Sequence, residues 1–240
     1  MVRILAVSDE ETLYKKSFTN KKFKNIDILV SCGDLSPSYL EYIVHKTMPT
    51  HRIMIHGNHD NIYFPHNYEH KSKGYSDIFK GMHVLNNDFY KIDKKEYNLD
   101  ENLVIAGFYG ANAHGSEPFF LDEKKLNFFA KKMKFKDFFL NYNLPKIILS
   151  HCAPNVNNLF KNIDSFHKPS NALGEIYNNF PPNLWFYGHI HPRYTKQKLD
   201  FKINTNNKNT YILNTVPYKI IDYDFKLNKI KIFPKKNKYF

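Results

Sequence analysis

The stretch "RIMIHGNHD", from Arg52 to Asp60, decides the fold of this chain. An apolar, β-branched run without helical periodicity stops at a glycine, and three polar side chains follow at once. This pattern predicts a strand that is buried on both faces and ends in a loop with metal-binding side chains. Taken alone, "GNHD" is equally typical of a tight turn, because glycine and asparagine readily adopt left-handed backbone conformations. The other strands of the chain must therefore decide between the two interpretations.

Five further runs have the same form. They are "RILAVSD", "IDILVSCGD", "LVIAGFYG", "KIILSHC" and "LWFYGHIH". Between the runs lie stretches with helical spacing, above all Pro37 to Thr47, where Leu40, Ile43 and Val44 fall on one face, and residues 122–133. This alternation predicts an α/β protein in which helices sandwich the sheets.

The end of the chain has a different pattern. "TYILNTV", "YKIIDYDF" and "KIKIF" alternate and follow one another closely, which predicts an antiparallel meander. The polar stretch from Lys202 to Asn209 predicts a hairpin loop. Because we find neither a linker nor an internal repeat, we expect a single domain over residues 1–240.

Composition restricts the class of protein. A net charge of +12 favours attraction of anionic substrates, but the lysines are scattered, so a nucleic-acid surface is not favoured. No apolar run reaches the length of a membrane span, and the first residues lack an export signal. Two cysteines, Cys32 and Cys152, are too few for a disulfide framework. We therefore expect a cytoplasmic protein without membrane contact.

The early strands end in side chains that bind metal ions. These are Asp9, Asp34, Asn58, His151, His189 and His191. Ligands in open α/β sheets bind beyond the carboxyl ends of the strands, which lie about 5 Å apart, so the side chains can converge. Carboxylates, an amide oxygen and imidazoles together suit Mn²⁺, Fe²⁺, Zn²⁺ or Ni²⁺. The set exceeds the needs of one tetrahedral ion, and a carboxylate shared by two ions accounts for the surplus.

The order of these motifs resembles that of the calcineurin-like metallophosphoesterases. The motifs are Asp9, then "GD" (Gly33 and Asp34), "GNHD" (Gly57 to Asp60), "SHC" (with His151) and "GHIH" (Gly188 to His191). The resemblance implies a four-layer α-β-β-α sandwich with an antiparallel C-terminal β segment. It also implies two divalent metal ions, one on Asp9 and His191, the other on Asn58, His151 and His189, with Asp34 bridging both.

The resemblance also implies an activity. His59 would stay unligated and face the phosphate, where an imidazole stabilises charge or protonates the departing oxygen, and Asp60 would support the site. A hydroxide bridging the metal ions would hydrolyse a phosphodiester or phosphomonoester bond. The expected substrate is a small phosphoester, with nucleotides as candidates. Arg193 either faces this substrate or pairs with an acidic side chain, and His114 is interpreted as a surface residue.

The stretch "LAVSDEE", from Leu5 to Glu11, departs from the family pattern. The superfamily reads Asp-x-His here, and Glu11 occupies the histidine position. Glu11 binds the first metal ion directly, or reaches it through water, or marks a lost site. We favour the direct ligand, which shifts the preference towards Mn²⁺ or Mg²⁺, because a bacterial and archaeal branch that this chain resembles has the same start. Glu10 would point to solvent. The alternative function is an inactive scaffold that binds a protein partner.

Overall fold

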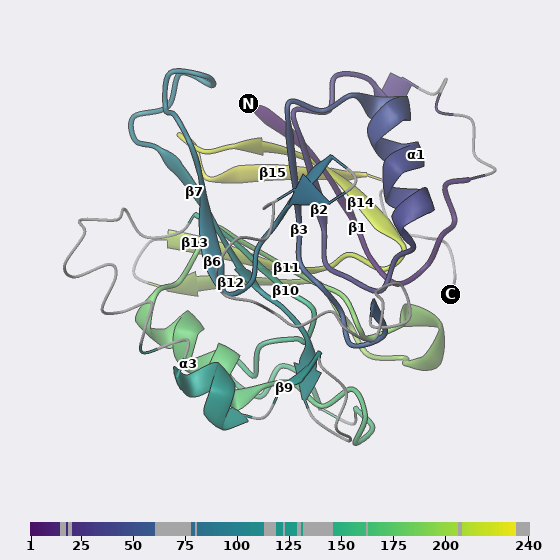
Figure 1. The fold of residues 1–240 in the computed structure, drawn as a ribbon. Coiled ribbons are helices and arrows are strands. Elements are labelled where there is room, and N and C mark those ends of the chain that lie inside the picture. Colours follow the sequence, from purple (N-terminus) through teal and green to yellow (C-terminus); the bar gives the residue numbers. More distant parts are fainter. Residues whose placement is uncertain are drawn as a thin grey trace.

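The apolar runs form the strands of two β-sheets that pack face to face in the computed structural model of the chain (Figure 1). The structure describes residues 1–14, 18, 21–60, 78–79, 81–112, 119–121, 123–128, 131, 146–161, 163–205 and 208–233. All six runs predicted as buried strands are strands, and the four residues of Ile28–Ser31, for example, are all buried.

The first sheet has seven strands in the order β15-β14-β1-β2-β3-β5-β4. They are β1 (Val2–Val7), β2 (Ile28–Ser31), β3 (His51–Met54), β4 (Ile78–Phe79), β5 (Met82–Val84), β14 (Tyr218–Asp224) and β15 (Lys229–Phe233). The four strands β1, β2, β3 and β5 run parallel, while β14, β15 and β4 are antiparallel to their neighbours. The carboxyl ends of β1, β2 and β3 therefore lie at one edge.

The second sheet has six strands in the order β12-β13-β11-β10-β7-β6. They are β6 (Asp88–Ile92), β7 (Leu103–Phe108), β10 (Ile147–Ser150), β11 (Leu184–Tyr187), β12 (Phe201–Thr205) and β13 (Lys208–Asn214). β7, β10, β11 and β13 are parallel, and antiparallel β6 and β12 form the edges. A short parallel pair, β8 (Ala111–Asn112) and β9 (Phe120–Leu121), stands apart.

Helices cover the outer faces of both sheets. Helix α1 (Pro37–Thr47), predicted with these bounds, begins at Ser36, whose hydroxyl accepts from the Tyr39 N–H. Its buried stripe packs on the first sheet, and each such side chain contributes about 1.5–3 kcal/mol by leaving water. Helix α3 (Asn171–Asn179) and Leu126, from helical residues 123–128, pack on the second sheet. Residues 122, 129, 130 and 133 of the second predicted helix lie outside the described residues.

A third apolar cluster fills the space between the two sheets and joins them. It contains Ile4 and Val30 from the first sheet and Ile105, Leu149 and Phe186 from the second. With the helices outside, the order of layers is α-β-β-α, as predicted. Two single turns of 3-10 helix, η1 (Lys21–Phe23) and η3 (Pro192–Tyr194), complete the described elements.

The C-terminal strands do not form the predicted three-strand meander. β13 pairs with β12 and β11 in the second sheet, and only β14 and β15 continue as an antiparallel pair in the first. The hairpin around Lys202 to Asn209 exists, but most of that stretch is strand, with β12 ending at Thr205 and β13 beginning at Lys208. The three segments are strands, as predicted, but β13 and β14 have runs of consecutive buried residues in place of alternation, and a strand pattern does not say which sheet a strand joins.

Candidate metal centre

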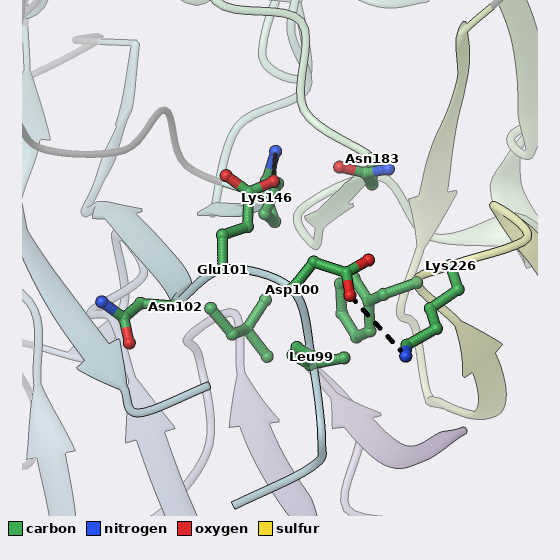
Figure 2. A pocket seen from close by; sticks show the side chains of 9 residues that line it. Leu99, Asp100, Glu101, Asn102, Lys146, Asn183 and Lys226 are labelled. Carbon is green, nitrogen blue, oxygen red and sulfur yellow. Dashed lines mark ion pairs between the residues drawn. The ribbon is translucent and has the colours of Figure 1, made fainter. Parts of the chain in front are cut away.

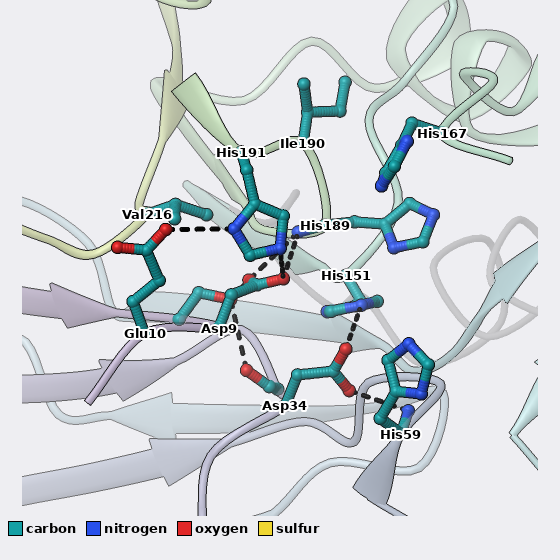
Figure 3. Close-up of polar contacts among 12 residues, drawn as sticks. Asp9, Glu10, Asp34, His59, His151, His167, His189, Ile190, His191 and Val216 are labelled. Carbon is teal, nitrogen blue, oxygen red and sulfur yellow. Dashed lines mark hydrogen bonds and ion pairs between the residues drawn. The ribbon is translucent and has the colours of Figure 1, made fainter. Parts of the chain in front are cut away.

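Side chains from both sheets meet at the carboxyl ends of their parallel strands (Figure 3). Asp9 follows β1, Asp34 follows β2 and Asn58 follows β3, all in the first sheet. His151 follows β10 and His189 follows β11, both in the second sheet. The predicted convergence is therefore present, but it occurs across the contact between two sheets as well as along one sheet edge.

The centre of this group is formed by Asp9, Asp34 and His151. One ligand atom from each lies within 4.8 Å of the other two. The His151 side chain is fully buried, and the Asp9 and Asp34 side chains are 3% and 9% exposed. Two carboxylates held this close in the interior repel each other, so the arrangement calls for positive charge between them.

The hydrogen bonds of His151 show where that charge belongs. Its Nδ1 lies 2.6 Å from the carbonyl oxygen of Cys32, which can only accept, so Nδ1 carries the proton. Its Nε2 lies 2.9 Å from Oδ1 of Asn58 and 3.2 Å from Oδ2 of Asp34. In the neutral ring, three lone pairs therefore point at one another, an arrangement that a bound cation would satisfy.

His191 has the same arrangement on the other side of Asp9. Its Nδ1 lies 3.0 Å from Oε1 of Glu10, so that nitrogen donates, and its Nε2 lies 3.6 Å from Oδ1 of Asp9. A carboxylate that holds the outer nitrogen of a metal-binding imidazole fixes the tautomer and the direction of the ring. Glu10, predicted to point to solvent, is thus a positioning residue in the group.

His189 is oriented by the backbone around it. Its Nε2 donates to the carbonyl oxygen of Phe166 over 3.0 Å, which leaves the Nδ1 lone pair for a ligand. Its backbone N–H points at the Asp9 carboxylate, 3.0 Å from Oδ2. Burial and the charge of the neighbouring His151 lower the pKa of His189 to about 3, so its ring is neutral at neutral pH.

The central groups have displaced pKa values. Burial opposes charge on His151, but the Asp34 and Asp9 carboxylates outweigh it and raise the pKa of His151 to about 10. Burial also opposes ionisation of Asp34, yet its contacts with His151 lower the pKa of Asp34. Burial dominates at Asp9 and raises its pKa. The balance of these effects again places a positive charge between the carboxylates.

Glu11 does not join this group. Its Oε1 accepts the backbone N–H of Ser36 over 2.8 Å, beside the start of α1, and the residue is exposed. The placement speaks against the direct metal contact that we favoured from the sequence. A hydrogen bond that tethers the β1 loop to the helix start is the role that the structure gives this side chain.

His59 and Asp60 occupy two different surroundings. His59 is exposed at the edge of the group, and its backbone N–H donates to Oδ1 of Asp34 over 2.8 Å. Asp60 is buried, and its Oδ2 accepts the backbone N–H of Gly57 over 2.8 Å. Asp60 therefore closes the turn that carries Asn58, while the ring of His59 stays next to the carboxylates (Figure 3).

Close backbone contacts hold the group together. A Cβ on Gly57 would lie 2.1 Å from Oδ1 of Asp34, and one on Gly188 would lie 2.6 Å from Oδ2 of Asp9. Asp9, Asp34 and His189 also have φ angles of 60°, 57° and 63°, in the left-handed region. Backbone strain of about 1–3 kcal/mol per residue is typical of functional sites. Two of these residues carry the carboxylates, and the backbone N–H of the third, His189, contacts Asp9.

One residue beside the group was missed from the sequence. The His167 ring lies 4.8 Å from the His189 ring, centroid to centroid, and its Nδ1 is 2.7 Å from Oδ2 of Asp164 (Figure 3). The Asp-x-x-His spacing is the sequence signal that could have shown it. Arg193 lies 3.6 Å from Oε1 of Glu10, so of its two predicted roles the pairing with an acid is present. His114 lies outside the described residues.

A hollow among the described residues lies away from the metal-binding group (Figure 2). It lies at the amino ends of β7, β10 and β11, opposite to the metal-binding side chains. Its charges are paired, Lys146 with Glu101 at 2.5 Å and Lys226 with Asp100 at 3.7 Å. Since no imidazole lines it, this hollow does not compete as the metal centre.

Comparison with known protein families shows which family this chain belongs to. The sequence model of the calcineurin-like phosphoesterase family matches residues 8–193, a span that includes the whole group. The chain belongs to this family, whose members are generally hydrolases of phosphoester bonds. No curated protein sequence matches it.

Two solved structures share the fold. One has a TM-score of 0.60 at 16% identity, and TT1561 of Thermus thermophilus has a TM-score of 0.54 at 13% identity. Both matches cover 96% of this chain and 97% of the other. At these identities the likeness concerns the fold alone. In the part of the chain that the structure describes, no helix has the length and apolar character needed to cross a membrane.

Proposed function

We propose that this protein is a metal-dependent phosphoesterase that uses two divalent ions to hydrolyse a small phosphodiester or phosphomonoester with water. One observation carries the proposal. The lone pairs of His151 Nε2, Asn58 Oδ1 and an Asp34 oxygen converge in the interior with no hydrogen atom to share in the neutral state of the ring. Family membership and the position of the group at the strand ends support it.

Two overlapping sets of side chains would hold the ions. Asp9, Asp34 and His191 suit one ion, and Asp34, Asn58, His151 and His189 suit the other. The mixture of carboxylate, amide and imidazole ligands is compatible with Mn²⁺, Fe²⁺, Zn²⁺, Ni²⁺ or Mg²⁺, and we favour Mn²⁺. When bound, such a pair of ions lowers the pKa of a water molecule and withdraws charge from a phosphoryl oxygen.

The chain itself contributes orientation and a proton. Backbone bonds to Cys32 and Phe166 fix the rings of His151 and His189, and Glu10 fixes His191. His59, exposed beside Asp34, is placed to donate a proton to the departing oxygen of the ester. Asp60 supports this step indirectly, because it closes the turn on which His59 stands.

The first test measures metal content and hydrolysis together. Protein purified without chelator is analysed for bound metals and assayed with bis-p-nitrophenyl phosphate in the presence of added Mn²⁺. We expect two ions per chain and turnover that depends on Mn²⁺. Nucleotides and other small phosphoesters are then screened as substrates, with nucleic acid as the less favoured class.

A scaffold without activity is the second candidate, and the position of Glu11 favours it. With Glu11 bound to Ser36, the first ion has one ligand fewer than the family pattern provides. A weakly held first ion would lower turnover and leave the fold for binding a protein partner. Zero or one ion per chain together with no turnover would support this candidate and contradict the phosphoesterase.

A further inference from the structure

The loop between β10 and α3 is fastened to the metal centre by its backbone. The carbonyl oxygen of Phe166 accepts from His189 Nε2 over 3.0 Å, and that of Lys168 accepts from the Cys152 thiol over 3.4 Å. Further along, the Ser170 N–H donates to the carbonyl oxygen of Ala153 over 2.9 Å. The position of this loop therefore depends on backbone atoms and not on the side chain of His167.

Within the loop, Asp164 fixes the direction of the His167 ring. Its Oδ1 accepts the backbone N–H groups of Phe166 and His167 over 2.9 and 3.1 Å, and its Oδ2 lies 2.7 Å from His167 Nδ1. Because a carboxylate only accepts, Nδ1 of His167 is the donor in this pair. The remaining ring nitrogen, Nε2, has no protein partner among the described residues.

The ring stands over the metal centre without belonging to it. Its centroid is 4.8 Å from that of His189 and 6.4 Å from that of His191, and its side chain is 27% exposed (Figure 3). An imidazole held in a fixed direction beside a cation site is suited to contact an anionic ligand of those cations.

A phosphoester needs donors for its anionic oxygens, and the three arginines of this chain all have protein partners. Arg3 forms two bonds to the Asp222 carboxylate, at 2.6 and 2.8 Å. Arg52 donates to the carbonyl oxygen of Pro49, and Arg193 faces Glu10. Among the described residues, His167 is held in a fixed direction on the histidine side of the centre, and as an imidazolium it can give a second N–H to an anion.

We propose that His167 is a substrate-binding residue: as an imidazolium it donates Nε2–H to a non-bridging phosphoryl oxygen, while its Nδ1–H is held by Asp164. The proposal rests on the proposed function for its substrate class, phosphoesters. Asp164 acts as the positioning residue, because it sets the ring direction without reaching the substrate.

Binding of inorganic phosphate tests the proposal without relying on turnover. Protein loaded with Mn²⁺ is titrated with inorganic phosphate in a calorimeter, comparing the unchanged chain with His167→Ala, His167→Gln and the control His45→Ala. We expect His167→Ala to weaken phosphate binding about tenfold or more, as for a lost hydrogen bond to a charged group. His167→Gln, which keeps an N–H donor, should recover part of the loss. His45, exposed in the last turn of α1, should have no effect.

Metal content and the Michaelis constant separate the outcomes. In His167→Ala we expect unchanged Mn²⁺ content and melting temperature, with KM for bis-p-nitrophenyl phosphate raised more than kcat is lowered. Equal phosphate affinity in His167→Ala, loss of Mn²⁺ from that variant, or no phosphate binding to the unchanged protein would each overturn the proposal. Phosphate binding that depends on His167 in a protein without ester hydrolysis would uphold it and overturn the phosphoesterase instead.

Discussion

Glu10 and Glu11 are neighbours with opposite surroundings. Glu10 holds His191 Nδ1 at 3.0 Å, whereas Glu11 bonds to the backbone of Ser36. From the sequence, the family pattern placed Glu11 at the metal ion, and alternation along an extended chain pointed Glu10 away from it, to solvent. The chain is not extended there, because Asp9 has a φ of 60°. The left-handed residue before Glu10 removes the extended backbone on which the alternation depends, and no pattern of residue types shows such a turn.

This contrast gives a paired prediction. Glu10→Ala frees the His191 ring to rotate, and we expect the affinity for one metal ion to fall about 10–100-fold. Glu11→Ala should leave metal affinity unchanged and slightly lower thermal stability, because it removes a bond at the start of α1. Titration of metal-free variants with Mn²⁺ measures both effects. Equal loss of affinity in the two variants would contradict this division of roles between Glu10 and Glu11.

In the proposed function, His59 acts in the chemical step rather than in metal binding. Its side chain is exposed and its backbone N–H contacts Asp34. We therefore expect His59→Ala to lower kcat for bis-p-nitrophenyl phosphate about 10²-fold, as for a lost general acid, with two metal ions retained. The measurement is steady-state kinetics with parallel metal analysis. Unchanged kcat would remove His59 from the mechanism.

At the scale of elements, the turns after the strands are as important for the candidate metal centre as the strands themselves, because they carry its side chains. Burial on both faces made β1, β2, β3, β7, β10 and β11 recognisable, and helical spacing marked α1. The sequence did not show that the metal-binding turns belong to two sheets. Nor did it show the loop that carries His167, because its bonds join backbone atoms to side chains far apart in the chain.

The turn at Gly57 yields a prediction at this scale. Its Cα faces Asp34 and His151 so closely that a Cβ would lie 2.1 Å from one and 2.7 Å from the other. Gly57→Ala should therefore lower the free energy of unfolding by about 1–3 kcal/mol and displace the Asp34 carboxylate, with loss of bound metal. Denaturant titration and metal analysis check this.

Gly81 provides the matched control. Its φ of 78° makes alanine strained there, but the nearest atom to a Cβ is 3.5 Å away and belongs to the flexible Arg52 side chain. Gly81→Ala should lower stability without changing metal content. If both variants keep their metal, the close approach at Gly57 does not serve the metal centre.

At the scale of the whole molecule, metal ions would join the two sheets. The ligands follow β1, β2 and β3 on one side and β10 and β11 on the other, so bound ions would tie the two layers together. An ion that binds only the folded state at a hundredfold excess over Kd adds about 2.7 kcal/mol to stability. For a chain of this size, removal of one such ion lowers Tm by about 5–10 °C.

Chelation followed by thermal unfolding measures this contribution. We expect Tm to fall on addition of EDTA and to recover when Mn²⁺ is restored in excess. In Glu10→Ala the fall should be smaller, because one ion is already weakly held. A Tm that does not respond to chelator in the unchanged protein would show that no ion bridges the sheets.

The first sheet is built from both halves of the chain. Residues 2–84 supply five of its strands, and β14 and β15 supply the other two. In Figure 1, the yellow-green β14 lies beside the purple β1. Every residue of β1 from Val2 to Val7 is paired with β14, in register from Tyr223 back to Tyr218. On the ribosome, β1 and the Asp9 turn are made long before β14, so the outer edge of β1 stays open until β14 emerges. We therefore expect the metal centre to mature only after β14 has been made, with β1 exposed as an unpaired, aggregation-prone edge until then.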